Sequence, residues 1–193
     1  MIDARPWTHA ALFGALWGAL ELSLGTILQL SRLPLRGSIM AICGLACMFT
    51  LRRLQPQVGV CALAGFVAVI LKVFTLGGFF PGPVIGIALE VLMVEVAFLI
   101  FRHKKLAAAM AGAGALATHP IQMVLMTTLM AGPEVVSAMV NSLVTSIETL
   151  GLGSPSIHFL ALLVICFFLI TGSFVGLWTW GLAIRVAQRV GTS

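Results

Sequence analysis

Five polar side chains interrupt the long apolar runs of this 193-residue chain, and they are its strongest candidates for chemistry. Ionisable groups inside such runs are costly, so they are normally paired or functional. Carboxylates, an amide and an imidazole can together hydrogen-bond a small molecule. The sequence therefore predicts a substrate-binding site, with no catalytic residues, formed by Glu21, Lys72, Glu90, His119 and Gln122.

The depth of these residues places most of them in one half of a helix bundle. At about 1.5 Å of rise per residue, Glu21 lies roughly 13 Å and Glu90 roughly 10 Å from the outer ends of their runs. On the same count Lys72 lies roughly 6 Å deep and Gln122 roughly 12 Å deep. We therefore expect a pocket open to the outside whose acidic walls favour a cationic or donor-rich ligand.

Structural roles compete with this interpretation. A Lys72–Glu90 ion pair between the third and fourth runs would explain both residues without a ligand, because buried charges are generally paired. His119 precedes Pro120, where it could bond a neighbouring helix beside a proline kink. Glu95 comes five residues after Glu90. The two carboxylates are thus about 140° apart around a helix and cannot face one ligand.

The composition indicates a membrane protein. The chain is 60% hydrophobic and 9% charged, with a mean hydropathy of +1.12, whereas soluble domains carry roughly 25% charged residues. We expect one transmembrane domain over residues 1–193. The net charge of +5 comes from basic residues that flank apolar runs, as orientation signals do. No basic–aromatic patch accompanies them, so nucleic acid is not an expected partner.

Six apolar runs approach the roughly 20 residues that a helix needs to cross a bilayer. They predict an all-α bundle of six transmembrane helices over about 8–30, 35–51, 58–76, 84–101, 106–130 and 157–184. Residues 133–150 differ, because their apolar side chains recur at three- and four-residue spacing among polar ones. This pattern is typical of a helix half-buried at a surface. We expect an amphipathic outer-surface helix that partly roofs the bundle.

The basic residues also predict the orientation of the spans. Alternating loops place Arg32 and Arg36 on one side of the membrane. The other side receives a larger group: Arg5, Arg52, Arg53, Arg102, Lys104, Lys105, Arg185 and Arg189. Because basic residues accumulate in cytoplasmic loops, both termini are expected to be cytoplasmic.

Small residues recur every four positions in the first run. Ala11, Ala15 and Ala19 form one stripe, and Gly14 and Gly18 belong to the neighbouring one. In lipid, such spacing lets another helix approach closely. These five residues are therefore predicted to form a docking surface for a partner helix.

Several classes of function lack support in the sequence. The four cysteines lie inside apolar runs, where a free thiol behaves as a small hydrophobic group. A soft-metal pair at Cys43 and Cys47 is a minor alternative, and neither a metal site nor a cofactor is expected. The nucleotide-binding, zinc-protease and serine-hydrolase motifs GxxxxGK[ST], HExxH and GxSxG are absent. We therefore expect no enzyme, and uphill transport would need a partner or an ion gradient.

With six expected spans, cytoplasmic termini and this alanine stripe, the chain resembles the substrate-binding S-component of energy-coupling factor (ECF) transporters. In that family an AxxxA pattern, here Ala11 and Ala15 with Ala19 continuing it, docks on a transmembrane coupling subunit that two ATPase subunits drive. The resemblance implies uptake of a vitamin-like molecule or metal ion, bound under the loops at 31–36, 77–83 and 131–156. It also implies a multi-pass protein of the cytoplasmic (inner) membrane of a bacterium or archaeon.

Two other classes of protein stay open. An ion- or proton-coupled secondary carrier would use Glu21, Glu90, Glu95 and His119 as a cation path, although the sequence shows no convincing internal repeat of the kind frequent in carriers. A non-catalytic membrane scaffold subunit would use its alanine-rich faces alone. A co-purifying ligand favours the S-component, and proton-coupled uptake by the isolated protein favours the carrier.

Overall fold

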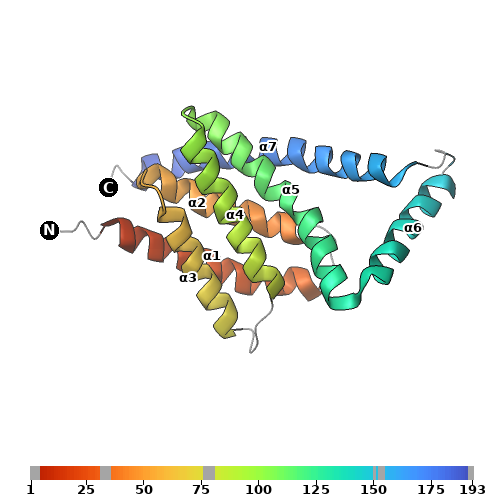
Figure 1. Cartoon of the computed structure of the whole chain (residues 1–193). Helices are drawn as coiled ribbons and strands as arrows, with labels where there is room; N and C mark the ends of the chain where they lie inside the picture. The colour runs from red at the N-terminus through yellow and green to blue at the C-terminus, as the bar shows by residue number, and fades with distance from the viewer. Residues whose placement is uncertain (1–4, 31–35, 76–80, 150, 152–154, 191–193) are drawn as a thin grey trace.

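Figure 1 shows a computed structural model of the chain, which describes residues 5–30, 36–75, 81–149, 151 and 155–190. These residues form seven helices and no strand, so the all-α prediction is confirmed. The helices are α1 (Arg5–Leu30), α2 (Arg36–Leu54), α3 (Val60–Thr75), α4 (Pro81–Ile100), α5 (Lys104–Ala131), α6 (Pro133–Thr149) and α7 (Ile157–Val190). Most of each loop expected at 31–36 and 77–83 lies outside the described residues.

Four of the described helices are long and apolar enough to cross a membrane. Their apolar segments have mean hydropathies between 1.4 and 2.6. They are Arg5–Leu28 in α1, Gly37–Leu54 in α2, Pro81–Ile100 in α4 and Ile157–Arg189 in α7. The apolar segment of α3, Val60–Phe74, is shorter. The described chain thus has the character of a multi-pass membrane protein.

Helix α2 lies at the centre of the bundle. It contacts α1, α3, α4, α5 and α7, and more than half of its apolar segment is buried. Leu45, Met48 and Phe49 are fully buried in the core that these helices share. Phe49 also packs edge-on against Phe98 of α4 and Trp180 of α7. Helix α2 therefore links the other helices of the bundle, although the most extensive contacts are those of α5 with α7, α1 with α3, and α4 with α5.

Backbone-to-backbone contact holds α7 against α5. Gly112 of α5 lies opposite Gly172 and Gly176 of α7, and all three are buried. A Cβ atom on Gly176 would overlap the carbonyl oxygen of Ala108 and would lie 3.2 Å from the Cα of Gly112. Small residues permit this approach in lipid, where close packing drives association. The contact is confined to the second half of α7, because residues 157–170 contain no buried side chain.

Helix α6 exists as predicted, but it does not roof the bundle. It contains no buried residue, packs on α5, and joins the far end of α5 to the start of α7 (Figure 1). Leu143, which belongs to the predicted apolar stripe, is 58% exposed. The reason is the length of α5, whose 28 residues exceed the 20 of α4. At 1.5 Å per residue, α5 reaches roughly 12 Å farther and carries α6 past the bundle.

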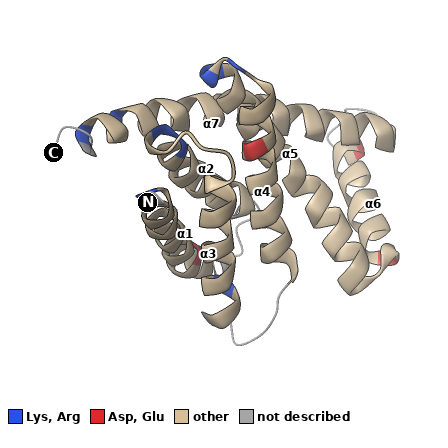
Figure 2. Ribbon diagram, turned by 60° about the vertical axis from the view of Figure 1, so that its left-hand side comes forward, with Lys and Arg blue, Asp and Glu red and all other residues tan. Residues whose placement is uncertain are grey.

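The charged side chains are distributed unevenly along the bundle. Most Lys and Arg residues lie at one end of the bundle (Figures 1 and 2). This end contains both ends of the chain, the α2–α3 connection and the α4–α5 connection. We call this the basic end. The acidic residues of α6 lie at the other end (Figure 2). Two described basic residues depart from the pattern, since Arg36 begins α2 and Lys72 occupies the last turn of α3, both away from the basic end.

The contact between α5 and α7 leads to a first prediction. Gly176→Ala should lower the free energy of unfolding by about 1–3 kcal/mol, because overpacking forces the backbones apart. The matched control is Gly181→Ala in the same helix, where an added Cβ would meet nothing within 4 Å. That change should be neutral or stabilise by up to about 1 kcal/mol through helix propensity. Thermal unfolding in detergent measures both, and equal effects would contradict the packing.

Candidate functional site

A buried ion pair joins α1 to α3. Lys72 Nζ lies 2.6 Å from Glu21 Oε2 and also donates to the backbone carbonyl oxygen of Glu21 at 3.1 Å. Both side chains are about nine-tenths buried. Gly25, one turn after Glu21, leaves room for the ammonium group of Lys72, because a Cβ atom on Gly25 would lie only 3.4 Å from Lys72 Nζ. Glu21 is thus neutralised within the protein.

The Lys72–Glu90 pair, considered above as a structural alternative, does not form. Helix α3 packs more extensively on α1 than on α4, so the lysine in its last turn meets Glu21. Glu90 is instead buried with Gly86, Ile87 and Val94 on the inner face of α4. The two acids therefore have different partners.

Glu90 lies near His119 of α5 at the centre of the bundle. Its Oε1 is 3.7 Å from His119 Nε2, which is longer than a hydrogen bond. Its Oε2 is buried and has no hydrogen-bond partner, and the same holds for His119 Nε2. A buried polar atom without a partner costs free energy, so this pair is an incomplete arrangement that a proton or a ligand could complete.

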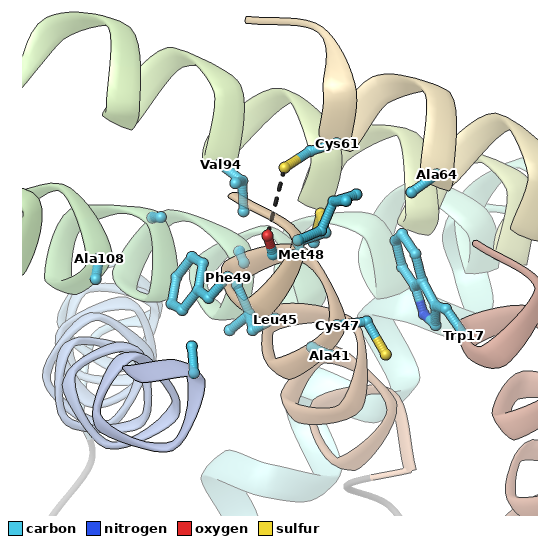
Figure 3. Close-up of a cluster of buried hydrophobic side chains, with 14 of the residues drawn as sticks. Trp17, Ala41, Leu45, Cys47, Met48, Phe49, Cys61, Ala64, Val94 and Ala108 are labelled. Atoms are coloured by element: carbon cyan, nitrogen blue, oxygen red, sulfur yellow. Dashed lines mark hydrogen bonds between the residues drawn. The ribbon is translucent and has the colours of Figure 1, made fainter. Parts of the chain in front are cut away.

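Trp17 of α1 completes this group, and the sequence analysis missed it. Its side chain is fully buried, yet its Nε1 has no hydrogen-bond partner in the described residues. Figure 3 shows the indole packed among the core residues near Cys47 and Ala64. The signal was available, because tryptophan is typical of membrane interfaces, whereas Trp17 lies inside its run, one turn before Glu21.

Gly44 of α2 brings Trp17 and Glu90 to the same place. A Cβ atom on Gly44 would lie 2.8 Å from Trp17 Cζ2 and 2.9 Å from Glu90 Oε2. Two turns earlier, a Cβ on Gly37 would lie 3.2 Å from His119 Nδ1. The glycines of α2 thus provide the space that the three polar side chains occupy. We call Trp17, Glu90 and His119 the central polar cluster.

Gln122 links α4 and α5 one turn away from His119. Its Nε2 donates to the backbone carbonyl oxygen of Gly82, and its amide lies against Gly86, one turn before Glu90. Of the five predicted site residues, Glu90 and His119 thus come together, Gln122 lies in the next turn, and Glu21 and Lys72 form their own pair. Cys43 of α2 is close enough to both Glu21 and Glu90 to interact with them electrostatically.

Glu95, the third acid of the spans, serves a separate structural site. Its Oε2 lies 3.2 Å from Arg52, and its Oε1 accepts hydrogen bonds from the backbone N–H groups of Gly59 and Cys61 at 3.1 and 3.0 Å. Arg52 also donates to the Gln57 carbonyl oxygen and lies over the Phe98 ring. Glu95 therefore caps the start of α3 and ties it to α2 at the basic end.

The two neighbouring stripes of small residues on α1 have different surroundings. Ala11, Ala15 and Ala19 are exposed, whereas Gly14 and Gly18 are buried against α3. A Cβ on Gly14 would lie 2.5 Å from the carbonyl oxygen of Ala64. The surface that a partner helix could reach is therefore the alanine stripe, and the two glycines belong to the α1–α3 contact.

The described residues contain no group of three or more His, Cys, Asp or Glu side chains that could hold a metal ion. Cys43 and Cys47 are both free thiols, and Cys47 is buried.

The Glu21–Lys72 pair leads to a second prediction. Lys72→Met should lower the free energy of unfolding by about 3–5 kcal/mol, because it leaves a buried carboxylate unpaired. Glu21→Gln should have a similar effect, whereas the double variant should recover part of the loss because neither charge is then buried alone. Thermal unfolding measures all three. Additive losses in the double variant would show that the two residues do not act as a pair.

Comparisons with protein-family models, with curated proteins and with solved structures found no match. A function for this chain therefore rests on its own composition, on the arrangement of its helices and on the polar groups buried among them.

Proposed function

We propose that this protein is the substrate-binding subunit of a membrane transporter of the ECF type, which captures a small organic molecule and passes it to partner subunits. The observation that supports this most is the central polar cluster. In the described part of the chain, Trp17, Glu90 and His119 are buried polar residues from three different helices, each with an atom that lacks a hydrogen-bond partner. Convergent polar groups in an apolar surround are typical of ligand sites.

The proposed topology has six spans: the four helices that are both long and apolar enough to cross a membrane, together with α3 and α5, while α6 lies on the outside. Four of the connections and chain ends lie at the basic end. The positive-inside rule assigns that end to the cytoplasm. In this topology the central polar cluster lies near the middle of the bundle, with Trp17 and Glu90 about halfway along α1 and α4. Gln122 lies about one turn farther toward the outer side, from which a substrate would arrive.

The chemistry of the cluster favours a ligand with hydrogen-bond donors and at least one acceptor. Glu90 Oε2 accepts a hydrogen bond when ionised, and Trp17 Nε1 can only donate one. Glu21 contributes less than the sequence suggested, because Lys72 already neutralises it. Glu90 is therefore the acid that would recognise the ligand, with His119 beside it and Gln122 in the adjacent turn.

The exposed alanine stripe supports docking on a coupling subunit. The stripe consists of exposed residues with small side chains, so the backbone of a partner helix could pack closely against it. Its members are Ala11, Ala15 and Ala19. The proposed partners are one transmembrane coupling subunit and two ATPase subunits. Purification from native membranes in mild detergent tests this proposal, with mass spectrometry of both proteins and small molecules. Recovery of the protein with neither would count against it.

A proton-coupled secondary carrier is the second candidate. The proximity of Glu90 and His119 favours it, because a small shift would close their 3.7 Å separation to a hydrogen bond along which a proton can move. Uptake that depends on a proton gradient and needs no ATPase partner would favour the carrier over the binding subunit.

Labelling of single cysteines tests the topology, in a background where the exposed Cys166 is replaced by serine. Ser137→Cys on α6 should react with a membrane-impermeant maleimide on intact cells, because α6 is assigned to the outer side. His103→Cys, between α4 and α5, should react only after the membrane is opened. The reverse pattern would contradict the proposed orientation.

A bulky residue in the alanine stripe tests the docking surface. Ala15→Trp should reduce co-purification of the coupling subunit at least tenfold, a loss of about 1.4 kcal/mol or more, with little change in thermal stability because Ala15 is exposed. The matched control is Gly14→Leu, which should lower stability, since Gly14 packs on the backbone of α3. Unchanged co-purification in Ala15→Trp would show that the stripe faces only lipid.

A further inference from the structure

The buried charges of the described chain balance everywhere except at Glu90. Glu21 pairs with Lys72 at 2.6 Å, and Glu95 pairs with Arg52 at 3.2 Å. Glu90 is 4% exposed and lies near no lysine or arginine among the described residues. Its polar neighbour His119 is 3.7 Å away and makes no hydrogen bond through Nε2. One buried carboxyl group is thus left without a matching cation.

The groups that face Glu90 do not supply this cation. The titratable side chains nearest to Glu90 are Cys43 of α2, Glu21 of α1 and His119 of α5. On α3, Lys72 is paired with Glu21 at 2.6 Å, so neither of these two residues brings Glu90 an unmatched positive charge. Arg52 and Cys61 lie nearer the basic end, at Glu95. An isolated carboxylate in this interior would be very costly, so the group is neutral unless a cation joins it.

We propose that Glu90 is a proton–cation exchange site, whose carboxyl group holds a proton in the unliganded protein and gives it up when an N–H-bearing cationic group of the ligand binds. The proton leaves for bulk water, the carboxylate pairs with the cation, and the net charge of the site stays the same. This inference rests on the proposed function for the place of the ligand, although the proton on Glu90 does not depend on it.

The surroundings of Glu90 Oε2 favour an ammonium-type cation. This oxygen and the Trp17 ring both lie within 3 Å of the position that a Cβ atom on Gly44 would occupy, so the two groups are close to each other. A carboxylate attracts a cation by its charge and forms charge-assisted hydrogen bonds with N–H donors. Methylammonium carries both features and is small, so it is a suitable probe, while tetramethylammonium has the charge without the N–H groups.

Infrared spectroscopy of the full chain in detergent tests the proton directly. The wild type should show the carbonyl band of a protonated carboxylic acid, above the amide region and sensitive to deuterium exchange. Glu90→Gln should lack it. Glu134→Gln is the matched control, because the same change is made at an exposed acid of α6. Glu90→Gln should also unfold at nearly the wild-type temperature, since glutamine resembles the neutral acid.

Titration with methylammonium tests the exchange. Methylammonium should abolish the acid band in the wild type, and tetramethylammonium at the same concentration should leave it in place. Since one proton competes with one cation, the apparent Kd for methylammonium should rise about tenfold for each unit of pH decrease. The concentration dependence of the unfolding temperature gives this Kd. Glu90→Gln should show no response specific to methylammonium.

Three results would overturn the exchange: no acid band that depends on Glu90, a band that persists under methylammonium, or a Kd independent of pH. If Glu90→Gln fails to fold, His119→Gln serves instead, and it should keep the acid band at a shifted frequency. Loss of the band in His119→Gln would overturn the assignment of the proton to Glu90. None of these measurements involves the partner subunits, so failure of the exchange and failure of the proposed transport role can be told apart.

Discussion

The cost of removing charged groups from water governs the interior of this protein. Glu21 and Lys72 satisfy it by pairing across α1 and α3, and Arg52 and Glu95 satisfy it across α2 and α4. Removal of either partner would leave a charge with no solvent to stabilise it. Glu90 is the exception. It is as deeply buried as the paired residues, yet its Oε2 has no partner among the described residues, and this is why we assign it a functional role.

Helices can meet closely enough to form these pairs because glycine and alanine line their contacts. Gly14 and Gly18 let α1 lie against α3, which brings Glu21 within reach of Lys72. Because Gly44 has no side chain, Trp17 and Glu90 can both pack against α2 at this residue. The glycines of α5 and α7 let the backbones of these two helices come into contact. In lipid, where apolar contact alone does not favour association, this shape complementarity stabilises the bundle.

Apolar length and proline or glycine boundaries were enough to predict the seven helices closely, because local hydrophobicity decides where a membrane helix forms. The partners of individual side chains were not predictable, because they depend on which helices become neighbours. Lys72 meets Glu21 and not Glu90 for this reason. Likewise Trp180 lies in the core with Phe49, while Trp178, two residues earlier in the same helix, is 53% exposed. The position of α6 depended on the lengths of α4 and α5, which no single run reveals.

The positions of the ion pairs along the chain also bear on the order in which the protein can assemble during synthesis. Lys72 follows Glu21 by 51 residues, and Glu95 follows Arg52 by 43. Both pairs are therefore complete once α4 has been made, so the first four helices already contain both partners of each ion pair. Glu90, in contrast, must wait for α5 to bring His119. The emerging chain thus secures its scaffold first and closes the central polar cluster afterwards.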